Sequence, residues 1–288
     1  MISKVNILKL KPSDYPAVLS QIDEPPKQLY IAGSPLSEWM NSPKVAVVGS
    51  RKTSSYGLGV TEKIVGELAR AGVVIISGLA LGIDAAAHRA ALAASGRTVA
   101  VLPTSLERIY PSTNQNLARQ IVEQGGALIS EYSPSEPIFK SNFLNRNRII
   151  SGLSDAVLVI EAPYRSGSLA TARYGLEQGK AVLAVPGNIT SLGSDGCNNL
   201  IKSGALPVTG ADDVFFALGI KLNKKRAVVF RGTDEEEALY ELIIGGVTDQ
   251  EVLAVKAGLS GAKTGSILTM LELSGSIKPL GAGHWVAS

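Results

Sequence analysis

The feature that most constrains this fold is a regular alternation, between residues 44 and 185, of short apolar runs and longer amphipathic segments. The run KVAVVG at residues 44–49 is typical, because it is short, almost wholly apolar and closed by glycine. A strand without a polar face suits a parallel sheet that helices cover on both sides. The pattern predicts strands at residues 44–49, 73–77, 98–102, 127–130, 156–161 and 181–185, separated by helices at residues 58–71, 84–94, 114–124, 141–150 and 169–178.

This alternation predicts an α/β fold for residues 44–220, with a doubly wound, mostly parallel sheet of the Rossmann-like type. Successive parallel strands are joined by right-handed crossovers, which place helices on both faces. Ligands of such sheets bind beyond the carboxyl ends of the strands. We therefore expect functional residues in the loops that follow the strands.

The flanking segments differ from the alternating region. Six prolines interrupt residues 1–43, which predicts an irregular lead-in that packs on the core. Residues 221–231 contain Lys224, Lys225 and Arg226 and are interpreted as a basic linker. In residues 232–288, helices expected at 235–244, 249–257 and 263–274 precede a glycine-framed hairpin, which predicts a small winged-helix-like domain.

Composition excludes several classes of protein. The apolar runs are too short for a membrane helix, which needs roughly 18 residues. Nothing near the start resembles a secretion signal. A single cysteine cannot form an internal disulfide, and two histidines do not make an ordinary zinc site. We therefore expect a cytoplasmic protein without a metal, a cofactor or a membrane partner.

Charge is distributed unevenly along the chain. Residues 232–288 hold three lysines against eight acidic residues, a net charge of −5, whereas residues 1–231 hold 25 basic against 17 acidic residues, a net charge of +8. A polyanion would therefore bind the larger N-terminal part. Scattered lysines and arginines also keep a surface soluble, so this asymmetry locates a site without establishing one.

Four predicted strand ends are rich in glycine, at residues 49–54, 78–82, 166–168 and 186–188. Glycine lets backbone N–H groups approach a ligand, and a following helix N-terminus adds partial positive charge. The plain alternative is that these glycines only turn tight corners, but the basic residues beside two of the loops favour phosphate binding. Neither the P-loop motif nor the dinucleotide fingerprint is present. The candidate phosphate contacts are Gly49, Ser50, Arg51 and Lys52 in the first loop, with Arg165, Ser166 and Gly167 in the third.

The segment KSNFLNRNR at residues 140–148 combines cations, amides and an aromatic ring. At helical spacing, Lys140, Phe143 and Asn147 share one face, with Arg146 beside them. Single-stranded nucleic acids are bound by this combination, because cations attract the backbone and rings stack on bases. The alternative is that Phe143 belongs to the core while the cations are merely solvated.

Asp84 and His88 lie four residues apart at the start of a predicted helix. A general acid–base pair is one interpretation, and a helix-capping aspartate is the other. An enzyme of the nucleotide phosphoribohydrolase type is one alternative for the whole chain, since that class has a similar sheet plan and glycine-rich phosphate loops, although its usual loop motif is missing here. A sequence-specific regulator that acts through residues 232–288 is another, although the helix at 263–274 offers only Lys263 as a basic contact.

Several segments together resemble the family of DNA-processing protein A, also called Smf. They include VVGSR at residues 47–51, SGLALGIDAAAH at 77–88, FLNRNRIISGLS at 143–154, SGSLATA at 166–172 and VPG at 185–187. The resemblance extends in order over residues 15–218, and the tail resembles the winged-helix appendage of the family more weakly.

The resemblance implies a non-catalytic protein that binds single-stranded DNA, protects incoming strands in natural transformation and loads the recombinase RecA, usually as a homodimer. It implies that Gly49, Ser50 and Arg51 form a phosphate-contacting loop and that Ser166 and Gly167 form a second one. It also implies that Lys140, Phe143 and Asn147 lie on a DNA-binding helix. The charge of −5 on the tail favours a structural or protein-binding role for that domain, because such a surface repels phosphates.

Overall fold

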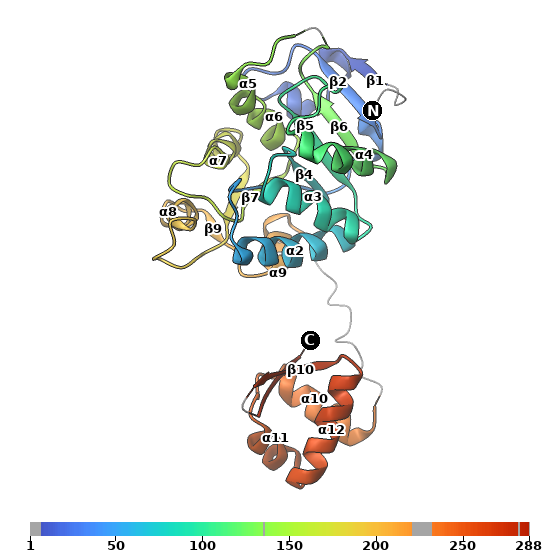
Figure 1. Ribbon diagram of the computed structural model, residues 1–288, viewed down its shortest axis with the longest axis vertical. Coiled ribbons are helices and arrows are strands. Elements are labelled where there is room, and N and C mark those ends of the chain that lie inside the picture. The colour runs from blue at the N-terminus through green and yellow to red at the C-terminus, as the bar shows by residue number, and fades with distance from the viewer. Residues whose placement is uncertain (1–6, 135, 221–231, 282, 288) are drawn as a thin grey trace. The chain divides into compact units, whose positions relative to one another are not determined.

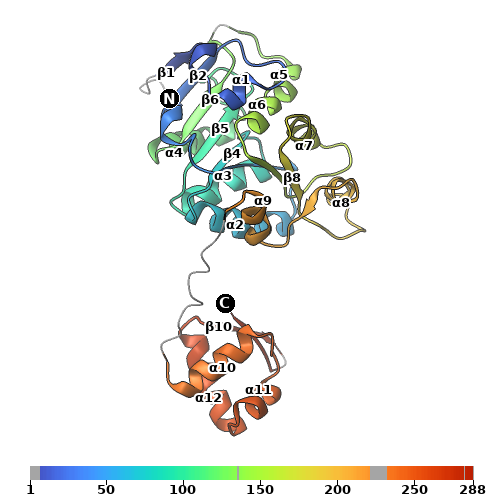
Figure 2. The same ribbon diagram turned by 180° about the vertical axis from the view of Figure 1, so that it is seen from behind.

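A computed structural model of the chain describes residues 7–134, 136–220, 232–281 and 283–287 (Figures 1 and 2). The chain divides into two compact units, Met1–Lys221 and Leu222–Ser288. The predicted basic linker at 221–231 lies outside the described residues.

The first unit is built on a nine-stranded sheet with the order β1-β2-β6-β5-β4-β3-β7-β8-β9. All pairings from β6 to β9 are parallel, whereas β1 pairs with β2, and β2 with β6, in antiparallel orientation. The predicted α/β fold with a mostly parallel sheet is therefore confirmed. The strands are β1 (Ile7–Leu10), β2 (Leu29–Gly33), β3 (Lys44–Val48), β4 (Val74–Ser77), β5 (Thr98–Leu102), β6 (Ala127–Ser130), β7 (Ala156–Val159), β8 (Ala181–Ala184) and β9 (Leu206–Pro207).

Helices cover both faces of this sheet. Alternate residues of one strand enter different hydrophobic cores. In β3, Val45 and Val47 pack toward α2, α3 and α9. Ala46 and Val48 pack on the opposite face, toward α6, α7 and α8. This period of two explains why a strand between helix layers has no polar side. The helices are α1 (Ala17–Ser20), α2 (Ser55–Arg70), α3 (Ile83–Ala93), α4 (Gln115–Glu123), α5 (Lys140–Asn145), α6 (Asn147–Gly152), α7 (Ser168–Glu177), α8 (Asp195–Lys202) and α9 (Ala211–Ala217), with 3-10 turns at Pro12–Asp14, Leu36–Glu38 and Ser112–Asn114.

Two expectations about local structure were wrong. The lead-in at 1–43 is not simply irregular, because it supplies β1 and β2 to the edge of the sheet and buries Leu19, Leu29 and Trp39 completely. The helix expected at 141–150 is divided into α5 and α6 at Arg146, although the backbone there remains right-handed helical.

The second unit has the expected three helices and hairpin: α10 (Asp234–Ile244), α11 (Gln250–Ala257), α12 (Gly261–Leu273), β10 (Ile277–Gly281) and β11 (His284–Ala287). Each helix begins with a capping side chain, from Thr233, Asp249 and Ser260 respectively, which accepts backbone N–H bonds. A separate apolar core that includes Leu239 and Leu268 holds the unit together. The predicted winged-helix-like fold is therefore confirmed. Within the described parts of the chain, no helix is long and apolar enough to cross a bilayer.

Candidate nucleic-acid interface

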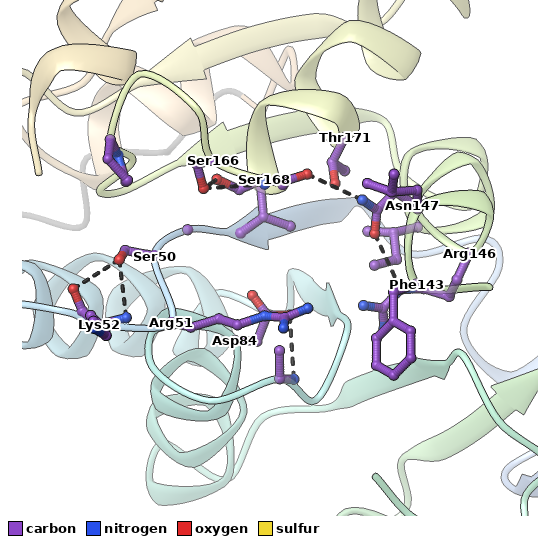
Figure 3. A pocket seen from close by; sticks show the side chains of 17 residues that line it. Ser50, Arg51, Lys52, Asp84, Phe143, Arg146, Asn147, Ser166, Ser168 and Thr171 are labelled. Atoms are coloured by element: carbon purple, nitrogen blue, oxygen red, sulfur yellow. Dashed lines mark hydrogen bonds between the residues drawn. The ribbon is translucent and has the colours of Figure 1, made fainter. Parts of the chain in front are cut away.

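A pocket of about 460 Å³ lies at the carboxyl ends of β3, β4 and β7, where the doubly wound fold predicts a ligand site. Its walls come from the loop after β3, the start of α3, the α5–α6 junction and the loop that leads into α7 (Figure 3). Of the eleven predicted site residues, nine line this pocket: Gly49, Ser50, Arg51, Lys52, Phe143, Arg146, Asn147, Ser166 and Gly167. Lys140 and Arg165 are exposed and do not line it.

The backbone of the loop after β3 is fixed by hydrogen bonds, whereas its two cationic side chains remain exposed. The backbone N–H of Ser50 donates to the carbonyl of Glu161 at 2.6 Å, and Ser50 Oγ bonds both the carbonyl and the N–H of Lys52. Gly49 is required sterically, since a Cβ there would lie 2.6 Å from the Ile83 side chain. The side chains of Arg51 and Lys52 remain exposed. This arrangement presents two positive charges on a fixed backbone.

Glu161 anchors the same loop and was not predicted as a site residue. Its Oε2 accepts hydrogen bonds from Thr53 Oγ1 and from the Ser54 N–H, both at 2.9 Å. Ser54 in turn caps α2 by accepting from the Gly57 N–H. The sequence signal was a single acidic residue at the end of an otherwise apolar strand, which is unusual enough to indicate a buried hydrogen-bonding role.

Arg146 is a structural residue in the floor of the pocket rather than a free cation. It is only 4% exposed, and its guanidinium donates to the carbonyls of Gly78 and Val101 and to Asn147 Oδ1. Burial lowers the pKa of Arg146 to about 10, an effect that the nearby Asp84 opposes. Because its Nε and Nη1 donors are occupied, Arg146 connects two strand ends while its charge adds positive potential to the pocket.

Asp84 and His88 are both buried, and neither is arranged as an acid–base pair. Asp84 does not cap α3, whose cap is Gly82; its Oδ2 instead accepts from the Gly78 and Ala80 N–H groups. Burial raises the pKa of Asp84 above its ordinary value, against the effect of Arg146. Burial lowers the pKa of His88 to about 3, so the imidazole is neutral.

Phe143 provides an aromatic surface at the pocket, which Figure 3 shows opposite Arg51. The Arg51 guanidinium lies 5.8 Å from the Phe143 ring centroid, within range of a cation–π interaction. Tyr110 packs edge-on against the same ring with centroids 5.1 Å apart. Phe143 is half-buried, so the ring is neither core nor fully solvated.

The expected shared face of Lys140, Phe143 and Asn147 is only partly formed. Asn147 is buried, and its amide Nδ2 donates to the Gly167 carbonyl at 3.2 Å. That bond connects α6 to the loop before α7, so Phe143 and Asn147 reach the pocket while Lys140 stays outside its lining. The break at Arg146 lies between Phe143 on α5 and Asn147 on α6, whereas Lys140 and Phe143 belong to the same helix.

The loop before α7 contributes a helix N-terminus to the pocket wall. Ser166 Oγ and Ser168 Oγ lie 2.7 Å apart, and α7 begins at Ser168. A Cβ added at Gly167 would have no neighbouring atom within 4 Å, so there is open space beside its backbone that a ligand can enter. Partial positive charge at a helix N-terminus favours an anion here. Among the described residues, no group of three His, Cys, Asp or Glu side chains could hold a metal ion.

Sequence comparison decides the family. The family model for DNA recombination-mediator protein A matches residues 6–219. The chain belongs to this family. Protein Smf of Escherichia coli K12 is 40% identical over 279 residues, which is 94% of this chain and 74% of the relative. The DNA processing protein DprA of Streptococcus pneumoniae R6 is 45% identical over 200 residues, 69% of this chain and 70% of the relative.

Two solved structures share the fold of this family member. The X-ray structure of DNA processing protein A from Streptococcus pneumoniae has a TM-score of 0.68 and 43% identity, and the match covers 73% of this chain and 74% of that one. A Helicobacter pylori structure, described for the single-stranded DNA binding mode of its DNA processing protein A, has a TM-score of 0.67 and 33% identity, with coverage of 76% and 98%.

Proposed function

We propose that this protein binds single-stranded DNA in the pocket at the carboxyl ends of β3 and β7. The observation that carries this proposal is the convergence of two exposed cations, Arg51 and Lys52, a half-exposed ring, Phe143, and the N-terminus of α7 on one cavity. Membership of the DNA recombination-mediator protein A family supports it, as does similarity to a protein whose structure was described for binding single-stranded DNA.

In this proposal, phosphates of the strand lie against Arg51, Lys52 and the backbone of the loops at Ser50 and Gly167. An unpaired base packs on Phe143, since stacking on an aromatic side chain contributes about 1–3 kcal/mol per base without sequence readout. A duplex keeps its bases stacked inside, so it cannot offer one to this ring. The pocket therefore favours single strands.

The wider role that we propose is protection of incoming strands in natural transformation and delivery of those strands to RecA, by a homodimer acting in the cytoplasm. The names of the relatives, DNA processing protein and recombination mediator, support this role. Exposed apolar side chains, Leu206 on the edge strand β9 and Phe216 on α9, are available for a subunit contact.

We propose binding rather than catalysis. Asp84 and Glu161, the carboxylates that the phosphoribohydrolase alternative would test as acid or base, both accept hydrogen bonds from loop backbone N–H groups. This use of the carboxylates favours a structural role for them.

The test is the affinity of the protein for a single-stranded oligonucleotide as a function of salt. Arg51→Ala should weaken binding and lower the slope of log K against log salt by about 0.7, the value for one lost phosphate contact on a single strand. Lys140→Ala should give a smaller loss, because Lys140 stands outside the lining. Arg119→Ala, on the exposed surface of α4, is the matched control. Unchanged affinity and slope in both Arg51→Ala and Lys140→Ala would refute the proposed interface.

A further inference from the structure

A second cavity, of about 610 Å³, is lined in part by Ser54, at the end of the loop that follows β3. It is lined by Ser54 and Tyr56 at the start of α2, by Glu161 at the end of β7, and by Asn188, Ser191 and Ser194 in the segment between β8 and α8. It shares no lining residue with the first pocket. Its size is within the usual range for small-molecule sites.

The distinctive group in this cavity is the carboxylate of Glu161, a residue that is only 6% exposed. Its Oε2 is occupied by Thr53 and Ser54, but no residue of the described chain donates a hydrogen bond to Oε1. Gly193 keeps the space beside Oε1 open, since a Cβ there would lie 2.6 Å from that oxygen. Oε1 is therefore a charged acceptor that remains accessible from the cavity, where a ligand N–H can hydrogen-bond to it.

The chemistry of this acceptor selects the class of ligand. A carboxylate oxygen repels phosphate and accepts from N–H groups, as carboxylates do with the amino group of cytosine. The ring of Tyr56 is 53% exposed, and its hydroxyl donates to the Pro186 carbonyl at 2.9 Å, which fixes the ring at the rim of the cavity. A carboxylate acceptor that faces the cavity beside a fixed aromatic ring suits a planar base.

We propose that this cavity binds a nucleobase that carries an exocyclic amino group, such as cytosine. The inference rests on the proposed function, because the first pocket would hold the neighbouring nucleotide of the same strand. Lys52 lines the first pocket and Ser54 lines the second, so their Cα atoms are within about 7 Å of each other. The protein therefore discriminates among single strands by base while it binds all of them through the backbone.

Glu161→Gln tests this assignment, because glutamine keeps one oxygen for Thr53 and Ser54 and presents an amide N–H toward the cavity. We would measure, by fluorescence anisotropy, the affinities for oligodeoxycytidine and oligodeoxythymidine of equal length. The wild-type protein should prefer oligodeoxycytidine by about threefold to tenfold, the value of one net hydrogen bond. Glu161→Gln should abolish or reverse this ratio, because thymine offers a carbonyl where cytosine offers its amino group.

A second variant tests the cavity independently, in case Glu161→Gln changes binding only because it disturbs folding. Ser191→Phe fills the cavity without touching the anchor of the loop and should also abolish the preference. Leu192→Phe, at a position 79% exposed and outside the lining, should retain it.

Free deoxycytidine and thymidine monophosphates, added as competitors, distinguish the two sources of the base. If the cytidine nucleotide competes more strongly than the thymidine nucleotide, the cavity also binds free nucleotides. If neither nucleotide competes, the cavity binds a base only within a strand. Equal wild-type affinity for the two oligonucleotides, or a ratio unchanged in Ser191→Phe, overturns the inference and leaves the proposed function intact. Failure to bind either oligonucleotide overturns the proposed function itself.

Discussion

Replacement of Arg146 by methionine should destabilise the first unit strongly while leaving the exposed cations of the pocket in place. Methionine fills much of the same space but leaves the carbonyls of Gly78 and Val101 without their donor. Each unsatisfied buried group costs about 1–3 kcal/mol. Asp84 also loses its buried neighbour, so we expect a total loss of about 3–5 kcal/mol in the free energy of unfolding, as for other buried charged groups that lose a partner.

Urea denaturation followed by tryptophan fluorescence measures this loss. The chain has two tryptophans, and a Trp285→Phe background leaves Trp39, which is completely buried in the first unit, as the reporter. Arg51→Met is the matched control, an exposed arginine of the same pocket that should change stability by less than about 0.5 kcal/mol but should weaken DNA binding. A loss below about 1 kcal/mol for Arg146→Met would refute the structural role argued from its hydrogen bonds.

The penalty for Arg146→Met should also depend on pH. The Arg146 guanidinium lowers the pKa of Asp84, so its removal raises that pKa further above the ordinary value of 3.8. A folded-state pKa above the unfolded one gives stability that is complete below pH 3.8 and is lost as pH rises. The difference in stability between wild type and variant should therefore be smaller near pH 4 than at pH 7.

Three further outcomes follow from the structure. Burial lowers the pKa of His88 from 6.5 to about 3 in the folded protein. The free energy of unfolding should therefore fall as pH drops below 6.5, by up to about 1.4 kcal/mol per pH unit. His88→Gln should make stability less dependent on pH in this acidic range than in the wild-type protein. Gly33→Ala should lower stability by about 1–3 kcal/mol in thermal melts, because φ is +99° and a Cβ would lie 2.4 Å from the Gly126 carbonyl oxygen. Lys263→Ala on α12, which removes the exposed ion pair with Glu235 of α10, should leave the affinity for single strands and its salt dependence unchanged. Weaker binding would instead support DNA recognition by the winged-helix-like unit.

The sequence predicts the centre of the sheet well and its edge poorly. The run at β3 could be recognised because a strand covered by two helix layers is apolar throughout. Strands β1 and β2 are short and lie among prolines, and β2 pairs in antiparallel orientation with β6, about 100 residues away, as in the pair Tyr30 and Ser130. Nothing local to residues 1–43 specifies such a partner.

The candidate site was predicted in position and only partly in detail. Ligands of doubly wound sheets bind beyond the carboxyl ends of the strands, and this rule indicated the loops that hold Arg51 and Ser166. In the structure, Arg51, Phe143 and Ser166 line one cavity at that edge of the sheet. The role of Arg146 could not be predicted, because its hydrogen-bond acceptors lie 68 and 45 residues away at strand ends. A basic residue in a basic segment gives no sign of whether it points outward or is buried.

The charged groups of the interface divide into two classes with different consequences for binding. Arg146, Asp84 and Glu161 are buried, and each makes hydrogen bonds that fix the loops. Arg51 and Lys52 are exposed on a backbone that those buried groups already hold in place. A strand that binds the exposed pair therefore breaks no internal hydrogen bond and orders little backbone, so little of its interaction energy is lost to reorganisation. Variants of the buried class should therefore alter binding through the shape of the loops, and variants of the exposed class through charge alone.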